Sequence, residues 1–397
     1  MARTMAEPTP SREEVERLRR KLRARDAERF SLRRGLGEVR ADIERIGASR
    51  AWRWGHAAAT FAARLRRRPV RTRGAVAQAL DRVQRLEQVL TPPGEPVTRE
   101  GPASFSISVA GTSREAAQRG GDFPFAAAIA RELERRGHPA RVQVLPAEED
   151  AGQDDVALVL RGRTRHTPRA AQSNVLWVIS HPEELSGAEC DGYDLVCVAS
   201  ERFAQTLRAQ TSAPVIVLDQ ATDPDLFHPD PGPGFAHDIV FVGNSRGVRR
   251  KALDDLLPTH HDLAVYGSGW DGLIDARHLG ASHVPNDELR RVYSSASVVL
   301  ADHWDDMREH GFIANRVYDA VACGAFVISD SVDGIEARFG GAVRSYESRE
   351  ELAQLLELFL ADPVEREARA VAGRARVLAE HTFSHRVDRL LEALAQV

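Results

Sequence analysis

The chain has 397 residues, 43% of them hydrophobic, which is enough to bury the cores of two domains and leave an extension. Three cysteines exclude a disulfide framework and their spacing fits no zinc motif, so we expect a reducing, cytoplasmic setting. The N-terminal residues are charged, and no apolar run approaches the roughly 20 residues that span a bilayer. We therefore expect neither a signal peptide nor a membrane-spanning helix.

The net charge of −4 is unevenly distributed along the chain. Residues 1–100 contain 24 lysines and arginines against 13 acidic residues, a net charge of +11, whereas residues 101–397 carry a net charge of −15. A basic arm on an acidic body predicts an anionic surface or an anionic partner for the arm.

Residues 11–47 have a heptad pattern that predicts a long helix with a coiled-coil seam. Ser11 and Glu14 have the spacing of a capping box at its start, and Arg25 and Arg29 weaken the seam in the middle. We expect a homo-oligomer through this segment, and the alternative is a single helix packed on the body. The apolar seam positions are Val15, Leu18, Leu22, Leu32, Leu36, Val39, Ile43 and Ile46.

Residues 49–73 combine aromatic side chains, among them Trp52 and Trp54, with six arginines in the stretch 64–73. This composition is typical of an interfacial helix with a polybasic flank, and it predicts peripheral contact with a membrane surface. Nucleic acid is a competing partner, but no base-reading motif accompanies the arginines, so we expect none. A third alternative is a solvated basic face on a helical hairpin with residues 75–90.

A linker rich in proline and glycine, residues 91–102, separates this arm from a region in which apolar runs alternate with amphipathic segments. That alternation predicts βαβ units and a parallel sheet. A loop is expected over 113–122, followed by a helix over 123–136 that Gly137 ends. The predicted strands are 105–109, 141–145, 156–160, 174–179, 195–199 and 215–217.

Polar residues directly follow the predicted strand 174–179. His181 stands in this run, at the carboxyl edge of a parallel sheet, where ligands bind. Either a site residue or a structural histidine fits the position.

A second α/β region begins after residues 219–227, the predicted interdomain linker. Strand 237–242 leads into a glycine-rich loop, and basic residues open the next helix. Small residues allow close backbone approach, and a helix start with cations suits a diphosphate. The loop has neither Walker spacing nor the third glycine of a dinucleotide fingerprint, and the alternative is a cationic helix surface. The candidate residues are Gly243, Asn244, Ser245, Arg246, Arg250 and Lys251.

The segment 298–330 places a polar loop between two apolar runs. Strands are predicted over 298–300 and 326–329, with a helix over 315–323 that Gly324 ends. The loop before the helix lies at the carboxyl edge, and the helix N-terminus is ready to meet an anion. Its candidate ligand-binding residues are Asp302, His303, Glu309, His310, Gly311, Phe312, Asn315 and Arg316. The remaining predicted elements are strand 263–266 and helices 286–295, 348–360, 363–380 and 384–394.

The sequence NRVYDAVACGAFVISD at 315–330 resembles the donor-site helix of GT-B glycosyltransferases, in particular the CgeB-like branch, or glycosyl transferases group 1. GGDFPFAAAIARELERRGH, NVLWVISHPEE and VYGSGWDGL resemble further segments of that family. The resemblance covers roughly 105–395 and implies an α/β GT-B fold, two Rossmann-like domains with a cleft between them, preceded here by a helical coiled-coil extension. The implied parts are the extension 1–100, an acceptor domain 103–222 completed by the C-terminal helix 384–397, and a donor domain 236–380.

The resemblance also implies a role for each part of the donor site. Arg246 and Lys251, with Arg250 next, would neutralise the leaving diphosphate, and Asp319 would hydrogen-bond the ribose hydroxyls. The nucleotide base would lie near 266–270, which includes Gly267, and near 283–286. Trp270 would either stack on the base or belong to the core.

On the acceptor side, the resemblance implies that Asp122, at the start of a helix, acts as a base toward the acceptor. The alternative interpretation of Asp122 is an ordinary N-cap aspartate. His181 would contact the diphosphate or the acceptor, or act as the base of an inverting enzyme. With Lys251, these residues are the catalytic candidates. The family more often has Glu at the position of Asp319 and another Glu eight residues earlier, where this chain has Gly311.

The implied activity is transfer of a sugar from a nucleotide-sugar to an acceptor, with a cell-surface or lipid-linked glycan favoured over a small molecule. No metal triad is evident, so we expect no metal and no cofactor besides the nucleotide-sugar substrate. Two alternatives remain open: a nucleotide-sugar epimerase, and a non-catalytic scaffold in an envelope assembly. We expect a cytoplasmic protein with peripheral contact at the inner face of the membrane.

Overall fold

A computed structural model describes residues 39, 101–146, 154–162, 165–169 and 172–397. The predicted coiled coil, apart from Val39, and the predicted basic segment lie outside the described residues. The described residues of 97–166 and 172–397 belong to one unit, which contains two parallel sheets. In the part of the chain that the structure describes, no helix is both long and apolar enough to cross a bilayer.

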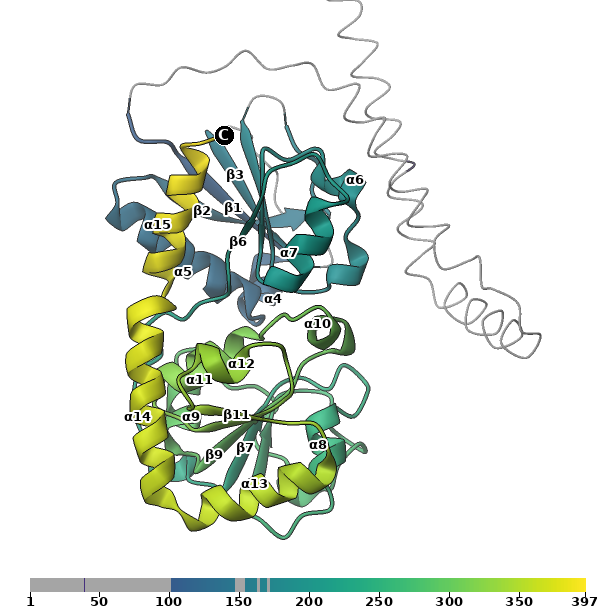
Figure 1. The fold of residues 1–397 in the computed structure, drawn as a ribbon, viewed down its shortest axis with the longest axis vertical. Coiled ribbons are helices and arrows are strands. Elements are labelled where there is room, and N and C mark those ends of the chain that lie inside the picture. Colours follow the sequence, from purple (N-terminus) through teal and green to yellow (C-terminus); the bar gives the residue numbers. More distant parts are fainter. Residues whose placement is uncertain (1–38, 40–100, 147–153, 163–164, 170–171) are drawn as a thin grey trace, which may run out of the picture. The chain divides into compact units, whose positions relative to one another are not determined.

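The first domain is built on six parallel strands in the order β2-β1-β3-β4-β5-β6 (Figure 1). Its inner strands are buried on both faces, which is why they appear in the sequence as continuous apolar runs. The strands are β1 (Phe105–Gly111), β2 (Ala140–Pro146), β3 (Val156–Arg161), β4 (Ser173–Val178), β5 (Leu195–Val198) and β6 (Val215–Val217). The helices are α4 (Arg114–Gln118), α5 (Asp122–Arg135), η1 (Pro182–Glu184), α6 (Gly187–Cys190), α7 (Glu201–Arg208) and, from the end of the chain, α15 (Phe383–Leu394).

The second domain is built on five parallel strands in the order β11-β10-β9-β7-β8. Its strands are β7 (Ile239–Val242), β8 (Leu263–Tyr266), β9 (Val298–Ala301), β10 (Val327–Asp330) and β11 (Val343–Tyr346). Its helices are η2 (Pro233–Phe235), α8 (Lys251–Leu256), η3 (Ala276–His278), α9 (Leu289–Ser295), α10 (Asp305–Glu309), α11 (Asn315–Ala322), α12 (Ile335–Arg338), α13 (Arg349–Ala361) and α14 (Pro363–Glu380). Two parallel sheets with covering helices confirm the predicted α/β fold.

Each sheet changes the direction of its strand order once. In the first sheet the change lies between β1 and β3, and in the second it lies between β7 and β9. The loops that leave neighbouring strands at such a point separate to opposite faces and leave a crevice at the carboxyl edge. The topology therefore marks the segments after β1, β7 and β9 as the place for a ligand.

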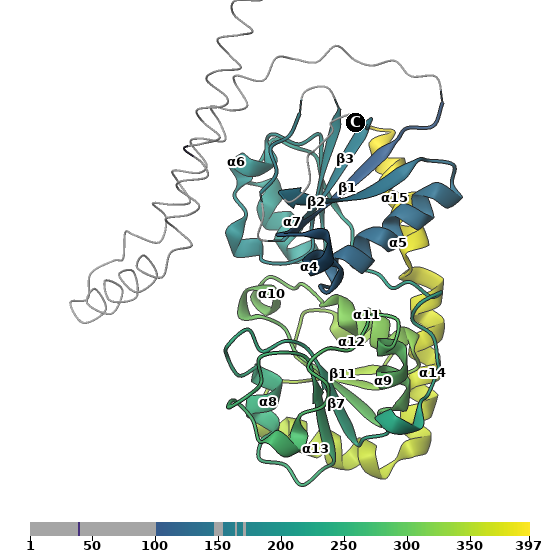
Figure 2. The ribbon, with the colours of Figure 1, turned by 180° about the vertical axis from the view of Figure 1, so that it is seen from behind.

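The last two helices join the domains (Figure 2). Helix α14 packs on the second domain, and α15 returns to the first, where Phe383 packs edge-on against Phe125 with ring centroids 4.6 Å apart. Between them, the backbone amide of Thr222 donates to the carbonyl of His381 at 3.0 Å, and the amide of Phe383 donates to the carbonyl of Thr222 at 3.1 Å. The last helix was predicted to cross back to the first domain, and α15 packs in the core of that domain.

Three local predictions were wrong. The expected loop 113–122 contains α4, because the Ser113 side chain caps it by accepting from the amide of Ala116 at 3.1 Å. The polar loop after β9 contains α10, and α9 begins at Leu289, later than expected, because a turn at Pro285 precedes it. Strand β11 was not predicted.

Helix α14 packs tightly against the second domain at Gly373, which offers a test of this packing. A Cβ atom there would lie 2.1 Å from the Cβ of Ala342 and 2.8 Å from the carbonyl oxygen of Phe339. We expect Gly373→Ala to lower the free energy of unfolding by about 1–3 kcal/mol, although alanine favours a helix, because the added methyl overpacks the contact.

The measurement is urea denaturation. Val371→Ala, which introduces the same residue at an exposed position of α14, is the matched control and should be neutral or mildly stabilising. A Gly373→Ala protein as stable as the control would contradict the described packing.

Candidate active site

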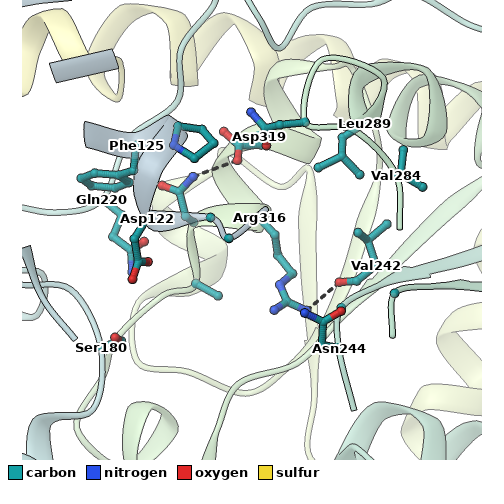
Figure 3. A pocket seen from close by; sticks show the side chains of 18 of the residues that line it. Asp122, Phe125, Ser180, Gln220, Val242, Asn244, Val284, Leu289, Arg316 and Asp319 are labelled. Atoms are coloured by element: carbon teal, nitrogen blue, oxygen red, sulfur yellow. Dashed lines mark hydrogen bonds between the residues drawn. The ribbon is translucent and has the colours of Figure 1, made fainter. Parts of the chain in front are cut away.

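A pocket of about 510 Å³ lies between the carboxyl-edge loops of the two sheets (Figure 3). Both domains line it, as the topology predicts. The lining comes from segments within 118–128, 179–181, 220–227, 242–250, 266–267, 282–293, 302–307 and 314–319, with Phe383. The predicted site residues in this lining are Asp122, His181, Gly243, Asn244, Arg246, Arg250, Gly267, Asp302, His303, Asn315, Arg316 and Asp319.

A buried ion pair joins Arg250 to Asp302 beneath the pocket. The Arg250 side chain donates to Asp302 through Nη2 and, at 3.1 Å, through Nε, and both groups have almost no exposed surface. The guanidinium also lies 4.1 Å from the ring centre of Trp304. Burial raises the pKa of Asp302, against the opposing charges of Arg250 and Arg316. Because breaking such a buried pair is costly, it fixes the loop after β9 to the start of α8.

Arg316, the second residue of α11, extends across the end of β7. Its Nη1 donates to the carbonyl of Val242 at 2.7 Å (Figure 3). Gly243 makes this possible, because a Cβ atom at that position would lie 2.6 Å from Nη1. The guanidinium is thus held beside the glycine-rich loop and the N-terminus of α11, a position suited to an anion.

His181 and Arg246 meet across the pocket from the two domains. The His181 Nε2 and Arg246 Nη1 atoms are 3.5 Å apart, and His181 Nδ1 lies 3.7 Å from a carboxylate oxygen of Asp306. Both residues have left-handed backbone conformations, with φ of 52° and 54°. Such strain is uncommon in residues other than glycine and is concentrated at functional sites.

Asp122 is the first residue of α5, and Gly121 occupies the N-cap position without a side-chain cap, so the alternative of an ordinary N-cap aspartate was wrong. The residue lines the pocket, and part of its surface is exposed. The surrounding protein raises its pKa by desolvation, against the opposing charges of Arg246 and His181. A carboxylate with a raised pKa is a better proton acceptor than an ordinary one.

Asp319 is 7% exposed and both of its carboxyl oxygens already have partners. The Thr222 hydroxyl donates to Oδ1 and the Asn315 amide donates to Oδ2, each at 2.8 Å. Burial raises the pKa of Asp319 to about 8, although these hydrogen bonds oppose the shift. The Asn315 Oδ1 atom is buried and has no partner within the described part of the chain. Of these two side chains, Asn315 therefore has the acceptor available for a ligand hydroxyl.

The end of the pocket beside β8 is lined by Tyr266, Gly267 and the segment 282–286, where the resemblance places the nucleotide base. Trp270 does not line it. Its ring is 1% exposed, packs edge-on against Phe241, and donates through Nε1 to the carbonyl of Gly243 at 2.8 Å. Trp270 is therefore a core residue that supports the glycine-rich loop, and it cannot stack on a base from this position.

The residues 309–312, predicted to bind the donor, lie outside the pocket lining and dock on the first domain instead. Ser200 donates to the carbonyl of His310, and the His310 ring packs edge-on against Phe203. Arg202 donates to the carbonyl of Glu309 at 3.1 Å. Phe312 is fully buried in a cluster that includes Phe203, and a Cβ atom at Gly311 would lie 3.2 Å from the Ser200 hydroxyl. This segment joins the domains.

Two predicted residues of the glycine-rich region also lie outside the lining. Lys251 pairs with Asp255 one turn along α8, and its Nζ lies 5.5 Å from the ring centre of Tyr346. Ser245 is fully buried and donates to the carbonyl of Gly269. Neither side chain lines the pocket, whereas that of Arg316 does.

Sequence reasoning missed Thr222, which holds Asp319, and Asp330, which pairs with His303. Asp330 ends the buried strand β10, and the strand-end argument applied to the other loops would have identified it. Among the described residues, the side chains close enough to share a metal ion are His260, His261 and Glu357, none of which lines the pocket.

The buried carboxyl of Asp319 should make stability depend on pH. Its folded-state pKa of about 8 exceeds the ordinary value of 3.8, so the folded protein keeps a proton that the unfolded chain loses between these values. Through this group, stability falls as pH rises across that window. As pH rises from 5 to 9, the natural protein should lose this contribution and Asp319→Asn should not. The free energy of unfolding of the variant, relative to that of the natural protein, should therefore increase by at least about 1 kcal/mol from pH 5 to pH 9.

Urea denaturation at both pH values measures this difference. Groups that titrate in both proteins cancel in the comparison, so a stability difference that is the same at pH 5 and pH 9 would show that Asp319 is ionised at neutral pH.

Comparison with known proteins agrees with this geometry. Residues 248–392, a little more than a third of the chain, match the family described as "Glycosyl transferase-like", whereas no match was found among curated proteins. Sucrose-phosphate synthase from Thermosynechococcus elongatus aligns with a TM-score of 0.54 and 14% identity, over 74% of this chain and 98% of that one. HepE from Anabaena, in complex with UDP and glucose, aligns with a TM-score of 0.52 and 13% identity, over 74% and 100%. An α-glucosyltransferase in complex with UDP-glucose and DNA aligns with a TM-score of 0.54 and 9% identity, over 74% of this chain and 100% of that one.

At these identities the structural likeness concerns the fold, which is that of GT-B glycosyltransferases, and the sequence match concerns the second domain. The chain therefore has the GT-B fold, and its residues 248–392 are similar to the glycosyl transferase-like family.

Proposed function

We propose that this protein transfers a sugar from a nucleotide-sugar to an acceptor hydroxyl in the pocket between its two sheets. The observation that carries the proposal is the convergence of Arg316, Arg246 and the N-terminus of α11 on one pocket that both domains line. A departing nucleoside diphosphate gains negative charge as the sugar leaves, and fixed cations with helix amides stabilise it.

The donor would extend along the carboxyl edge of the second sheet. Its base fits the end beside β8, against the segment 282–286, and its ribose fits next to Asn315, whose Oδ1 accepts a hydroxyl. Its diphosphate then lies beside Gly243 and Arg316. A side chain at position 243 would collide with the Arg316 guanidinium. The solved neighbours that contain UDP and glucose or UDP-glucose make uridine nucleotides the first donors to test.

The acceptor would enter from the first domain. Its hydroxyl oxygen forms a bond to the anomeric carbon while the bond from that carbon to the diphosphate breaks, and the hydroxyl proton must move to a base. Asp122 supports this role, because it lines the pocket and desolvation raises its pKa. His181 lies on the same side, within reach of Arg246, where it can orient the reacting groups.

The acceptor class and the location of the protein are inferred from the N-terminal arm. Its net charge of +11 and the aromatic residues near 52–54 favour a glycan carried on an anionic lipid surface. In this proposal the arm holds the enzyme at the inner face of the membrane, and the heptads over 11–47 assemble copies of the chain.

A thermal-shift panel tests the donor proposal. Ligands that bind the folded state raise the melting temperature by mass action, and a ligand at 100 times its Kd contributes about 2.7 kcal/mol. We expect one nucleoside diphosphate and its nucleotide-sugars to raise the melting temperature, equally with and without EDTA. We also expect slow release of nucleoside diphosphate when the nucleotide-sugar is incubated with the enzyme. No shift with any UDP, GDP, ADP or dTDP compound would contradict the proposal.

The fit of the diphosphate beside Gly243 gives a sharper test. Gly243→Ala should weaken binding of the nucleoside diphosphate about tenfold or more, because the new methyl displaces the Arg316 guanidinium. Gly121→Ala is the matched control, since Gly121 lines the same pocket, has a helical φ of −72°, and would place its Cβ in open space. Equal binding by the two variants in calorimetry would argue against a diphosphate at this place.

A further inference from the structure

A buried carboxylate–imidazole pair lies at the carboxyl edge of the second sheet. His303 follows β9 and Asp330 ends β10, and the His303 Nδ1 atom lies 2.6 Å from Asp330 Oδ1. The backbone amide of His303 also donates to Asp330 Oδ2 at 3.2 Å, and neither side chain has exposed surface. Two hydrogen bonds from one residue to one carboxyl group fix the orientation of the imidazole ring.

The other ring nitrogen of His303, Nε2, has an unusual environment for a buried polar atom. His303 lines the pocket, yet its Nε2 is buried and has no hydrogen-bond partner among the described residues. A buried polar atom without a partner costs stability, which makes a functional explanation worth seeking. Because Nδ1 donates to the carboxylate, the neutral ring carries its lone pair on Nε2 and can accept one hydrogen bond.

Asp330 is suited to hold the ring in this form. Burial acts to raise the pKa of Asp330, but its interactions with His303, the hydrogen bond from the ring foremost, and the charge of Arg308 outweigh it, so the pKa lies below its ordinary value. An ionised carboxylate accepts from Nδ1 and cannot donate to it, which leaves a single tautomer for the neutral imidazole.

The strand order places this pair beyond the diphosphate. Across the edge of the second sheet, β8 carries the base end of the pocket, β7 carries Gly243, and β9 and β10 carry His303 and Asp330. A nucleotide-sugar laid along this edge has its parts in the same order, base, diphosphate and sugar. The sugar therefore comes to β9 and β10.

Other polar groups of the loop are engaged elsewhere. Glu309 and His310, expected to contact the donor, lie outside the pocket lining and bond the first domain through their backbone carbonyls, and Asp302 is paired with Arg250. On the second domain, His303 is the pocket-lining side chain beyond the diphosphate with a buried acceptor atom still open to a ligand.

We propose that His303 Nε2 accepts a hydrogen bond from a hydroxyl group of the transferred sugar, and that Asp330 is the positioning residue that fixes the ring for this contact. This inference rests on the proposed function and adds the group that reads the sugar. Because the contact is to the sugar and not to the nucleotide, its loss should weaken binding of the nucleotide-sugar and leave binding of the nucleoside diphosphate unchanged.

The test compares two substitutions that keep different halves of the imidazole. His303→Asn places an amide near the position of Nδ1, so it keeps the bond to Asp330 and loses the acceptor at Nε2. His303→Gln places its amide near the position of Nε2, so it keeps a group for the sugar. Calorimetry measures the affinity of each variant for the nucleoside diphosphate and the nucleotide-sugar that raise the melting temperature in the panel above.

We expect His303→Asn to bind the nucleoside diphosphate within about twofold of the natural protein and the nucleotide-sugar about five- to tenfold more weakly. His303→Gln should recover part of the lost affinity for the nucleotide-sugar. Asp330→Asn should show the same selective loss as His303→Asn, because its amide can donate to Nδ1 and move the ring proton to Nε2.

Three results would overturn the inference: unchanged nucleotide-sugar affinity in His303→Asn, equal weakening of both ligands, or no recovery in His303→Gln. If His303→Asn does not fold, His303→Gln and Asp330→Asn still decide between a selective and a uniform loss. Failure of every nucleotide-sugar to bind the natural protein would instead remove the proposed function, and this inference with it.

Discussion

The second domain buries three aspartates at the carboxyl edge of its sheet, and their need for partners determines the geometry of the site. Asp302 binds Arg250, Asp330 binds His303, and Asp319 accepts from Thr222 and Asn315. A carboxyl group removed from water is costly unless it is neutralised or hydrogen-bonded, so each aspartate ties its loop to a neighbouring element. The polar loop after β9 is in this way attached to α8 and to β10, and helix α11 is attached through Thr222 to the connection between the domains.

These attachments decide which groups remain for a ligand. The carboxyl groups of these three aspartates are occupied by their partners within the protein. Arginine side chains, the amide oxygen of Asn315 and one nitrogen of His303 remain at the pocket. That selection suits a molecule with an anionic centre and hydroxyl groups on both sides of it, as a nucleotide-sugar has. The docking of residues 309–312 on α7 adds a second constraint, because it joins the loop to the first domain.

The sequence predicted the strands other than β11, and the edge at which the site lies, for a physical reason. Buried parallel strands appear as continuous apolar runs, and the polar residues that follow them must lie at the carboxyl edge, as Asp302 and His181 do. Which way each side chain points depends on partners distant in sequence. Trp270 turns to the carbonyl of Gly243 and His310 packs on Phe203, and neither contact has a local signal. Lys251 is different, because its partner Asp255 is only four residues further along α8. The predicted coiled coil lies outside the described residues, apart from Val39, and stays a prediction.

The central claim is that a nucleotide-sugar lies along the edge of the second sheet from β8 to β10, and a crystal structure of the protein with a bound nucleotide-sugar tests it most directly. The account predicts the base against residues 282–286, the diphosphate between Gly243 and Arg316, and the sugar within hydrogen-bonding distance of His303 Nε2. A nucleotide bound in the opposite direction, or outside this pocket, would contradict it.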